Sequence, residues 1–280
     1  MRRPSFEERE AGLTAPPQLD RDQVSAELRA VMWHEFSTAM FATAQYGTII
    51  FRHGWEEILR DKHVYRDHRL DGFPSAAKVQ VELRLELSKA TYPKFYGLIE
   101  FLLLHDKCPG AFEQAVERAL AASRAPYRIL DHDTLVPLTS DAELNAVQGA
   151  LNSTALAEIQ GSREHLKEAA SLIAGGQWAA SVRESIHAVE SIALVLSPGS
   201  ETLGPALKML GHHMDLHEAL KRGFSAIYGY TSDSSGIRHA LLDKGDAAVD
   251  EADALFMLGA CASFVSYLVS KARSASLLQS

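Results

Sequence analysis

The chain has 280 residues, of which 46% are hydrophobic and 23% are charged, and its formal net charge is −8 at pH 7. This composition is typical of a soluble globular protein with one large or two ordinary domains. The acidic balance excludes an open basic face that holds nucleic acid by bulk attraction, so any such contact must be local, as in a cleft enclosed between two subunits.

Cysteine usage and hydropathy indicate the compartment. Cys108 and Cys261 are far apart in sequence, which supports neither a disulfide framework nor a cysteine metal site and fits a reducing cytoplasm. The N-terminus lacks the apolar core of a signal peptide. The longest uncharged run, 254–270, is shorter than the roughly 20 residues that span a bilayer, and we interpret it as a buried helix. We therefore expect a cytoplasmic protein without a membrane partner.

The first part of the chain predicts an arm followed by helices. Residues 1–21 hold three prolines and a glycine among charges, which favours an extended N-terminal arm. One apolar helical face fits residues 22 to about 59, where Gly47 and Gly54 interrupt or end it. Further helices are expected at about 75–89, from Pro93 onward and at 109–123. The alternation of apolar residues in 75–89 also fits a strand, but the neighbouring polar residues favour helix.

A β-hairpin is the next predicted element. The segments YRIL and TLVPL flank the polar turn 131–133, and Pro137 places the second strand at an edge. Ser140 and Glu143 form a capping-box pattern that opens a helix at about 141–151. This helix closes a predicted first domain of residues 22–152.

Residues 153–280 have a helical pattern throughout, with helices expected at 155–174, 176–196, 203–225 and 246–275. Up-and-down helices bury a common apolar seam, which places the intervening loop 229–245 at the start of the last helix. The predicted fold is therefore mainly α: a helical N-terminal domain with one small β-hairpin, and a C-terminal four-helix bundle.

The loop before the last helix holds the strongest candidate site. Arg238 and His239 follow a run of small polar residues that begins near Asp233. Such residues form turns and backbone hydrogen bonds and contribute little to an apolar core. An imidazole that titrates near neutrality beside a permanent positive charge suits acid/base work on a phosphodiester. In the alternative interpretation Arg238 pairs with Asp233 and His239 only begins a helix.

A second candidate lies on the predicted helix 176–196. Arg183 and His187 are four residues apart, and Glu190 follows on nearly the same face of the helix. In one interpretation all three side chains reach a common cleft. In the other they only form the polar flank of an apolar stripe. Tyr228 and Tyr230 offer stacking surfaces for a base.

Other polar clusters have simpler interpretations. His213 and His217 have a spacing that zinc sites use on helices, but HExxH is absent, and we interpret His212, His213 and His217 as a solvated turn. The cluster from His63 to Arg69 is interpreted as an exposed polar loop. The sequence has no GxxxxGK[ST], GxGxxG or GxSxG pattern. We expect no metal and no cofactor.

Several segments together resemble a known family: RPSFEEREAG, YRILDHDTLVPLTSDAE, SIHAVESIAL and YGYTSDSSGIRHAL. They are similar to bacterial abortive-infection (phage-defence) proteins in which an AbiJ-type N-terminal domain, here 22–152, precedes a HEPN-like helical domain, here 153–280. The resemblance spans nearly the whole chain, and its last motif is the most specific.

The resemblance implies a homodimer formed through the C-terminal bundle, whose shared cleft cuts RNA without a metal. The ribose 2′-hydroxyl attacks the adjacent phosphate, while His239 transfers a proton and Arg238 stabilises the developing charge. Asp233 or His187 assists these two residues.

The spacing between Arg and His in the motif supports an alternative to catalysis. The family motif places Arg roughly four to six residues before His, whereas Arg238 directly precedes His239. In that alternative the module is not catalytic and binds a nucleotide, RNA or a regulatory protein partner, with Arg238, Arg183, Tyr228 and Tyr230 as contacts. A third alternative is a structural dimerisation partner in a larger defence complex.

Overall fold

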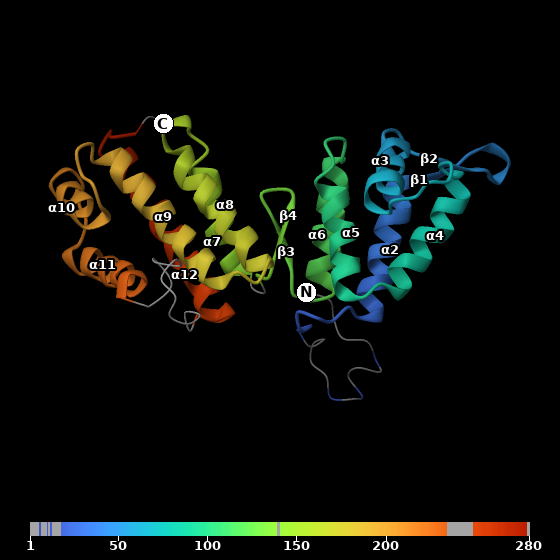
Figure 1. Cartoon of the computed structure of the whole chain (residues 1–280), viewed down its shortest axis with the longest axis horizontal. Coiled ribbons are helices and arrows are strands. Elements are labelled where there is room, and N and C mark those ends of the chain that lie inside the picture. Colours follow the sequence, from blue (N-terminus) through green and yellow to red (C-terminus); the bar gives the residue numbers. More distant parts are fainter. Residues whose placement is uncertain are drawn as a thin grey trace. The chain divides into compact units, whose positions relative to one another are not determined.

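The computed structural model describes residues 18–138, 141–233 and 249–278 together with Phe6, Glu10 and Gly12, apart from the side chains of Asp141, Ala157 and residues 230–233. The chain divides into two compact units, Met1–Thr139 and Ser140–Ser280. Both are mainly helical, and the described residues include two small antiparallel two-stranded sheets (Figure 1). The predicted class, mainly α, is confirmed.

The first unit consists of helices with two inserted hairpins. Its elements are α2 (Ala26–Met40), β1 (Phe41–Thr43), η1 (Gln45–Gly47), β2 (Ile49–Phe51), α3 (Trp55–Asp61), η2 (Lys62–Arg66), α4 (Ala76–Lys89), α5 (Tyr92–Leu103), α6 (Gly110–Ala122), β3 (Arg128–Leu130) and β4 (Thr134–Val136). The predicted helices at 75–89, from Pro93 and at 109–123 are confirmed, and so is the hairpin β3–β4.

The helical face predicted over 22–59 is confirmed for α2 and α3, and it is interrupted at Gly47 and Gly54, as the sequence allowed. The hairpin β1–β2 that forms the interruption was not predicted. Ser25 caps α2 by accepting a hydrogen bond from the Leu28 backbone N–H, but α2 ends at Met40, and β1 then pairs with β2. The turn between these strands uses backbone with positive φ at Tyr46 (71°) and Gly47 (78°), which helices do not contain. The β-branched and aromatic residues of β2 favour a strand over a helix.

Aromatic side chains form the core of the first unit. The Phe112 ring lies 5.1 Å from that of Phe36 and 5.0 Å from that of Trp55, so α6 is joined to both α2 and α3. All three side chains are fully buried. Rings in such tilted and edge-on contacts add to the free energy gained by burial.

The second unit contains α7 (Asp141–Ser153), η3 (Ala157–Ile159), α8 (Gln160–Ala174), α9 (Trp178–Leu196), α10 (Leu203–His213), α11 (Glu218–Asp233) and α12 (Glu251–Ser274). Helices α7, α8, α9 and α12 pack side by side as a bundle, and α10 and α11 lie against α9 (Figure 1). The sequence pattern placed the helix 141–151 at the end of the first domain, whereas α7 packs with α8 and α12.

The single helix predicted over 203–225 is wrong, because α10 ends at His213 and α11 begins at Glu218. Met214 has extended backbone and is buried together with Leu216, so the break is held by apolar packing. The ring Nδ1 of His217 accepts a hydrogen bond from the Ala219 backbone N–H, which caps α11. Residues 229–233, expected in a loop, continue α11.

Among the described residues, α12 is the one helix long and apolar enough to cross a membrane by length and composition. Half of its apolar stretch, which has a mean hydropathy of 1.7, is buried within the protein. The helix contacts α7, α8 and α9, so the buried helix expected at 254–270 is confirmed as the core helix of the bundle.

Candidate functional site

The leading residues from the sequence motif, Arg238 and His239, lie outside the described residues. Asp233 is the last residue of α11, and Tyr230 lies one turn earlier, but the description does not include either side chain. Their expected roles stay predictions. The site is therefore built from the residues of α8, α9 and the first part of α11.

Small side chains let α8 and α9 pack closely. Ser162 and Ala169 on α8 and Ser181, Ser185 and Ala188 on α9 are all fully buried. Their spacings of three, four and seven residues place them on one face of each helix. At Gly161 a β-carbon would lie only 2.8 Å from the Ser191 Oγ, so the helices also approach closely at that end.

The tight connection through Gly175, Gly176 and Gln177 sets the register of these helices. Gly176 has φ 71°, a conformation that glycine adopts without strain, and α9 then returns along α8. His165 and His187 are equally far from Gly176 in sequence, so they come to the same level of the two helices.

At that level Glu184 lies between the two imidazoles. Its Oε2 is 2.7 Å from the Nδ1 of His165, and its Oε1 is 3.6 Å from the Nδ1 of His187. The two rings lie 5.4 Å apart, edge to face. We call these three residues the α8–α9 histidine cluster. Its side chains are 38% (His165), 20% (Glu184) and 41% (His187) exposed, so water and ligands reach the cluster.

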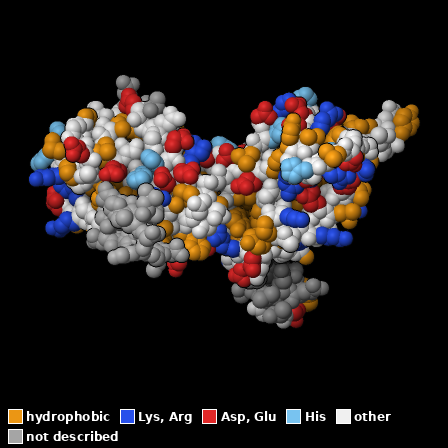
Figure 2. Space-filling model, in the orientation of Figure 1, with side chains coloured by type: hydrophobic (Ala, Val, Ile, Leu, Met, Phe, Trp, Pro, Cys, Tyr) orange, Lys and Arg blue, Asp and Glu red, His pale blue; other side chains and the backbone are white. Residues whose placement is uncertain are grey.

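The predicted face of α9 is confirmed. Arg183, Glu184, His187 and Glu190 are all half-buried, and the α9 residues between them are buried. Tyr228 joins this face from α11, because its hydroxyl donates a 3.4 Å hydrogen bond to the Glu190 Oε1. Figure 2 shows histidine side chains beside acidic ones on the visible face of this unit. The predicted residues His187, Arg183 and Tyr228 therefore belong to one polar region.

The arrangement suits proton transfer. Both imidazoles face Glu184 through Nδ1, which leaves the Nε2 of each ring to exchange a proton with a ligand. A carboxylate in this position fixes the orientation and the tautomer of the ring, as the aspartate of a catalytic triad does.

The pattern 183/187/190 identified His187, but sequence reasoning missed His165 and Glu184. The signal that finds His165 is its distance from Gly176, which matches that of His187 once the two helices are taken as an antiparallel pair. His212, His213 and His217 are exposed, as expected for a solvated turn.

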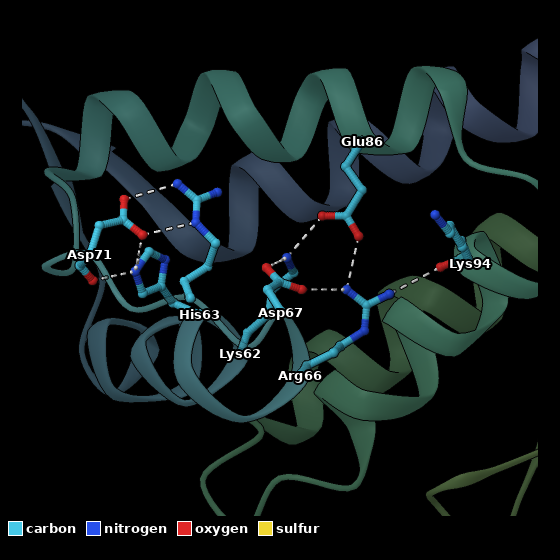
Figure 3. A network of polar contacts seen from close by, with 8 residues as sticks. Lys62, His63, Arg66, Asp67, Asp71, Glu86 and Lys94 are labelled. Carbon is cyan, nitrogen blue, oxygen red and sulfur yellow. Dashed lines mark hydrogen bonds and ion pairs between the residues drawn. The ribbon is translucent and has the colours of Figure 1, made fainter.

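The first unit contains a second polar cluster (Figure 3). Lys62 is only 8% exposed, and its Nζ lies 2.6 Å from the Asp67 Oδ2 and 2.8 Å from the Glu86 Oε2. The Arg66 Nη1 lies 2.8 Å from the other oxygen of Glu86. His63 is also buried, and its Nε2 lies 3.0 Å from the Asp71 backbone oxygen. The interpretation of residues 63–69 as an exposed polar loop is therefore wrong for His63, which is buried in η2.

Charge pairing sets the pKa values in this cluster. Burial alone would raise the pKa of Glu86, but Lys62 and Arg66 outweigh it and hold the pKa below its ordinary value. Hydrogen bonds from Arg69 lower the pKa of Asp71 to about 2. A pocket of about 320 Å³ adjoins the cluster and is lined by Lys62, His63, Arg69, Phe73 and Glu86 among others. Lys62, Arg66 and Arg69 each have a carboxylate partner, and His63 has a carbonyl partner. We therefore interpret the cluster as structural.

Comparison with models of known protein families, with curated proteins and with solved structures finds no match for this chain. Function is therefore inferred from the residues and their geometry.

Proposed function

We propose that the chain is a metal-independent ribonuclease of HEPN type that acts in phage defence, as a homodimer formed through its C-terminal bundle. The observation that carries the proposal is the position of His187, which is accessible to solvent and faces the carboxylate of Glu184. The choice of RNA as the substrate rests on the resemblance of the sequence motifs to those of the HEPN-like family.

In the proposed reaction His187 is the general base. Its Nδ1 faces Glu184, and its Nε2 takes the proton of the ribose 2′-hydroxyl as that oxygen attacks the adjacent phosphorus. His165 is a positioning residue, because its 2.7 Å contact holds the other oxygen of Glu184.

The sequence motif supplies the remaining groups. Arg238 stabilises the charge that develops on the phosphoryl oxygens, and His239 gives a proton to the 5′-oxygen as its bond to phosphorus breaks. One proton thus moves from the 2′-oxygen to the 5′-oxygen, and the products carry a 2′,3′-cyclic phosphate and a 5′-hydroxyl. Asp233 assists His239, while Tyr228 and Tyr230 stack on flanking bases.

Cleavage of single-stranded RNA by purified protein in the presence of EDTA tests the proposal. Removing a general base costs on the order of 10²–10⁴ in rate. We therefore expect His187→Gln and His239→Ala each to lower kcat/KM by about 100-fold or more, with 2′,3′-cyclic phosphate ends in the wild-type products. His213→Gln, an exposed histidine of the same unit, is the matched control and should leave the rate unchanged. Equal rates in the wild type and His187→Gln would contradict the proposal.

The adjacency of Arg238 and His239 favours a second candidate function: a non-catalytic module that binds a nucleotide, RNA or a protein partner. Here Arg238 contacts an anion and Tyr228 stacks on a base. In titrations with nucleotides and short RNAs, Arg238→Ala should weaken binding about tenfold or more while the wild type cleaves nothing. Unchanged affinity for every ligand would eliminate the anion contact.

A further inference from the structure

The α8–α9 histidine cluster also has the composition of a metal site. Among the described residues, His165, Glu184 and His187 are the one group of three His, Cys, Asp or Glu residues that each offer a ligand atom within 4.8 Å of the others. Two imidazoles and one carboxylate form a ligand set that proteins use for zinc, leaving the fourth position open.

The distances between these atoms fit a first-row transition metal after small side-chain movements. With metal–ligand bonds of about 2.0–2.1 Å in tetrahedral geometry, ligand atoms lie about 3.3–3.5 Å apart. The Glu184 Oε2 lies 2.7 Å from the His165 Nδ1, and the Glu184 Oε1 lies 3.6 Å from the His187 Nδ1. Both rings are more than a third exposed, so His165 and His187 have room to rotate about their side-chain torsions.

The backbone holds the ligands in place before any metal binds. Glu184 and His187 are three residues apart on α9, and the close packing of α8 against α9 brings His165 to the same level. Rigid helices position metal ligands better than loops do. Nitrogen ligands disfavour Mg²⁺ and Ca²⁺, which prefer oxygen.

We propose that the α8–α9 histidine cluster binds one divalent transition-metal ion, Zn²⁺ by its ligand chemistry, and that this ion inhibits the chain. The ion bonds the Nδ1 atoms of His165 and His187 and an oxygen of Glu184, while each neutral ring keeps its proton on Nε2. Binding follows from the ligand geometry alone. Inhibition rests on the proposed ribonuclease function, because a metal-bound His187 no longer accepts a proton from the substrate.

Titration of the full-length chain, prepared without a histidine tag, tests the binding. We expect one equivalent of Zn²⁺ by calorimetry, visible absorption from Co²⁺ at the same site, and no binding of Mg²⁺. His165→Gln and Glu184→Gln should each weaken Zn²⁺ binding by about 100-fold, since even residues outside the ligand shell are worth 10–100-fold in affinity.

The exposed His213 and His217 provide the control. Their double substitution by Gln should leave Zn²⁺ binding unchanged, and circular dichroism should show that each variant stays folded. Zn²⁺ affinity that is the same in the wild type, His165→Gln and Glu184→Gln would overturn the proposal. So would binding that disappears with His213 and His217.

The two proposals fail in different ways. If one equivalent of Zn²⁺ binds and no RNA is cleaved, the metal site is supported and the ribonuclease proposal is contradicted. If RNA is cleaved and Zn²⁺ does not bind tightly, the ribonuclease proposal is supported and the metal site is contradicted. If both hold, Zn²⁺ should inhibit the wild type with a midpoint near its dissociation constant, and EDTA should restore the rate.

Discussion

At the scale of single residues, the Lys62–Glu86 pair shows why partners far apart in sequence matter. Lys62 is buried only because Asp67 and Glu86 surround its ammonium group, and Glu86 comes from a different helix, α4. The sequence shows a charged run at 62–71, which by itself is typical of exposed chain. Its burial depends on a contact that no local pattern contains.

Substitution of Glu86 should destabilise the first unit. Glu86→Gln leaves the ammonium of Lys62 buried with one carboxylate partner, so we expect the free energy of unfolding in urea to fall by about 1–3 kcal/mol. Glu82→Gln, on the same helix and 40% exposed, is the control and should change it by less than about 0.5 kcal/mol. Equal effects of the two substitutions would contradict a structural role for the cluster.

The same pair predicts a dependence on pH. Because the folded-state pKa of Glu86 lies below its ordinary value of 4.5, this group stabilises the fold above that value. The stabilisation is lost as pH falls through the lowered pKa, where the folded protein takes up the proton. The difference in stability between wild type and Glu86→Gln should therefore shrink from pH 6 to pH 3, and a growing difference would contradict this assignment.

At the scale of elements, helices with clear end signals were predictable. Pro93 marked α5, and the flanking polar turn marked the hairpin β3–β4. The break at 214–217 was not predictable, because it contains neither Gly nor Pro and depends on the burial of Met214 and Leu216. Likewise β1 and β2 have only three residues each, which is too few for the alternation of apolar and polar residues in a strand to be recognised.

The start of α12 gives a prediction at this scale. The Asp250 side chain accepts a hydrogen bond from the Asp253 backbone N–H, and the Asp253 side chain accepts one from the Asp250 backbone N–H. Asp250→Ala should lower the melting temperature and cost about 0.5–2 kcal/mol of unfolding free energy, whereas Asp250→Asn keeps the cap and should cost little. If both substitutions cost the same, the side-chain cap does not stabilise α12.

At the scale of the whole molecule, the net charge of −8 limits how the chain meets RNA. The proposed site offers two arginines, Arg183 and Arg238, and each phosphate neutralised on single-stranded RNA contributes about −0.7 to the slope of log affinity against log salt. We expect a slope of about −1.4 in binding titrations at 50–300 mM salt. Arg238→Ala should reduce it to about −0.7, and a slope beyond −4 would indicate an extended basic surface instead.

The seam of serine and alanine between α8 and α9 also constrains how this protein can evolve. Ser181, Ser185 and Ala188 are fully buried, so a larger residue at any of them forces the helices apart. Such a change alters the spacing of His165 and His187 without touching either ring. A mutation at any of these three positions is thus expected to change the reactivity of the cluster and the stability of the bundle together.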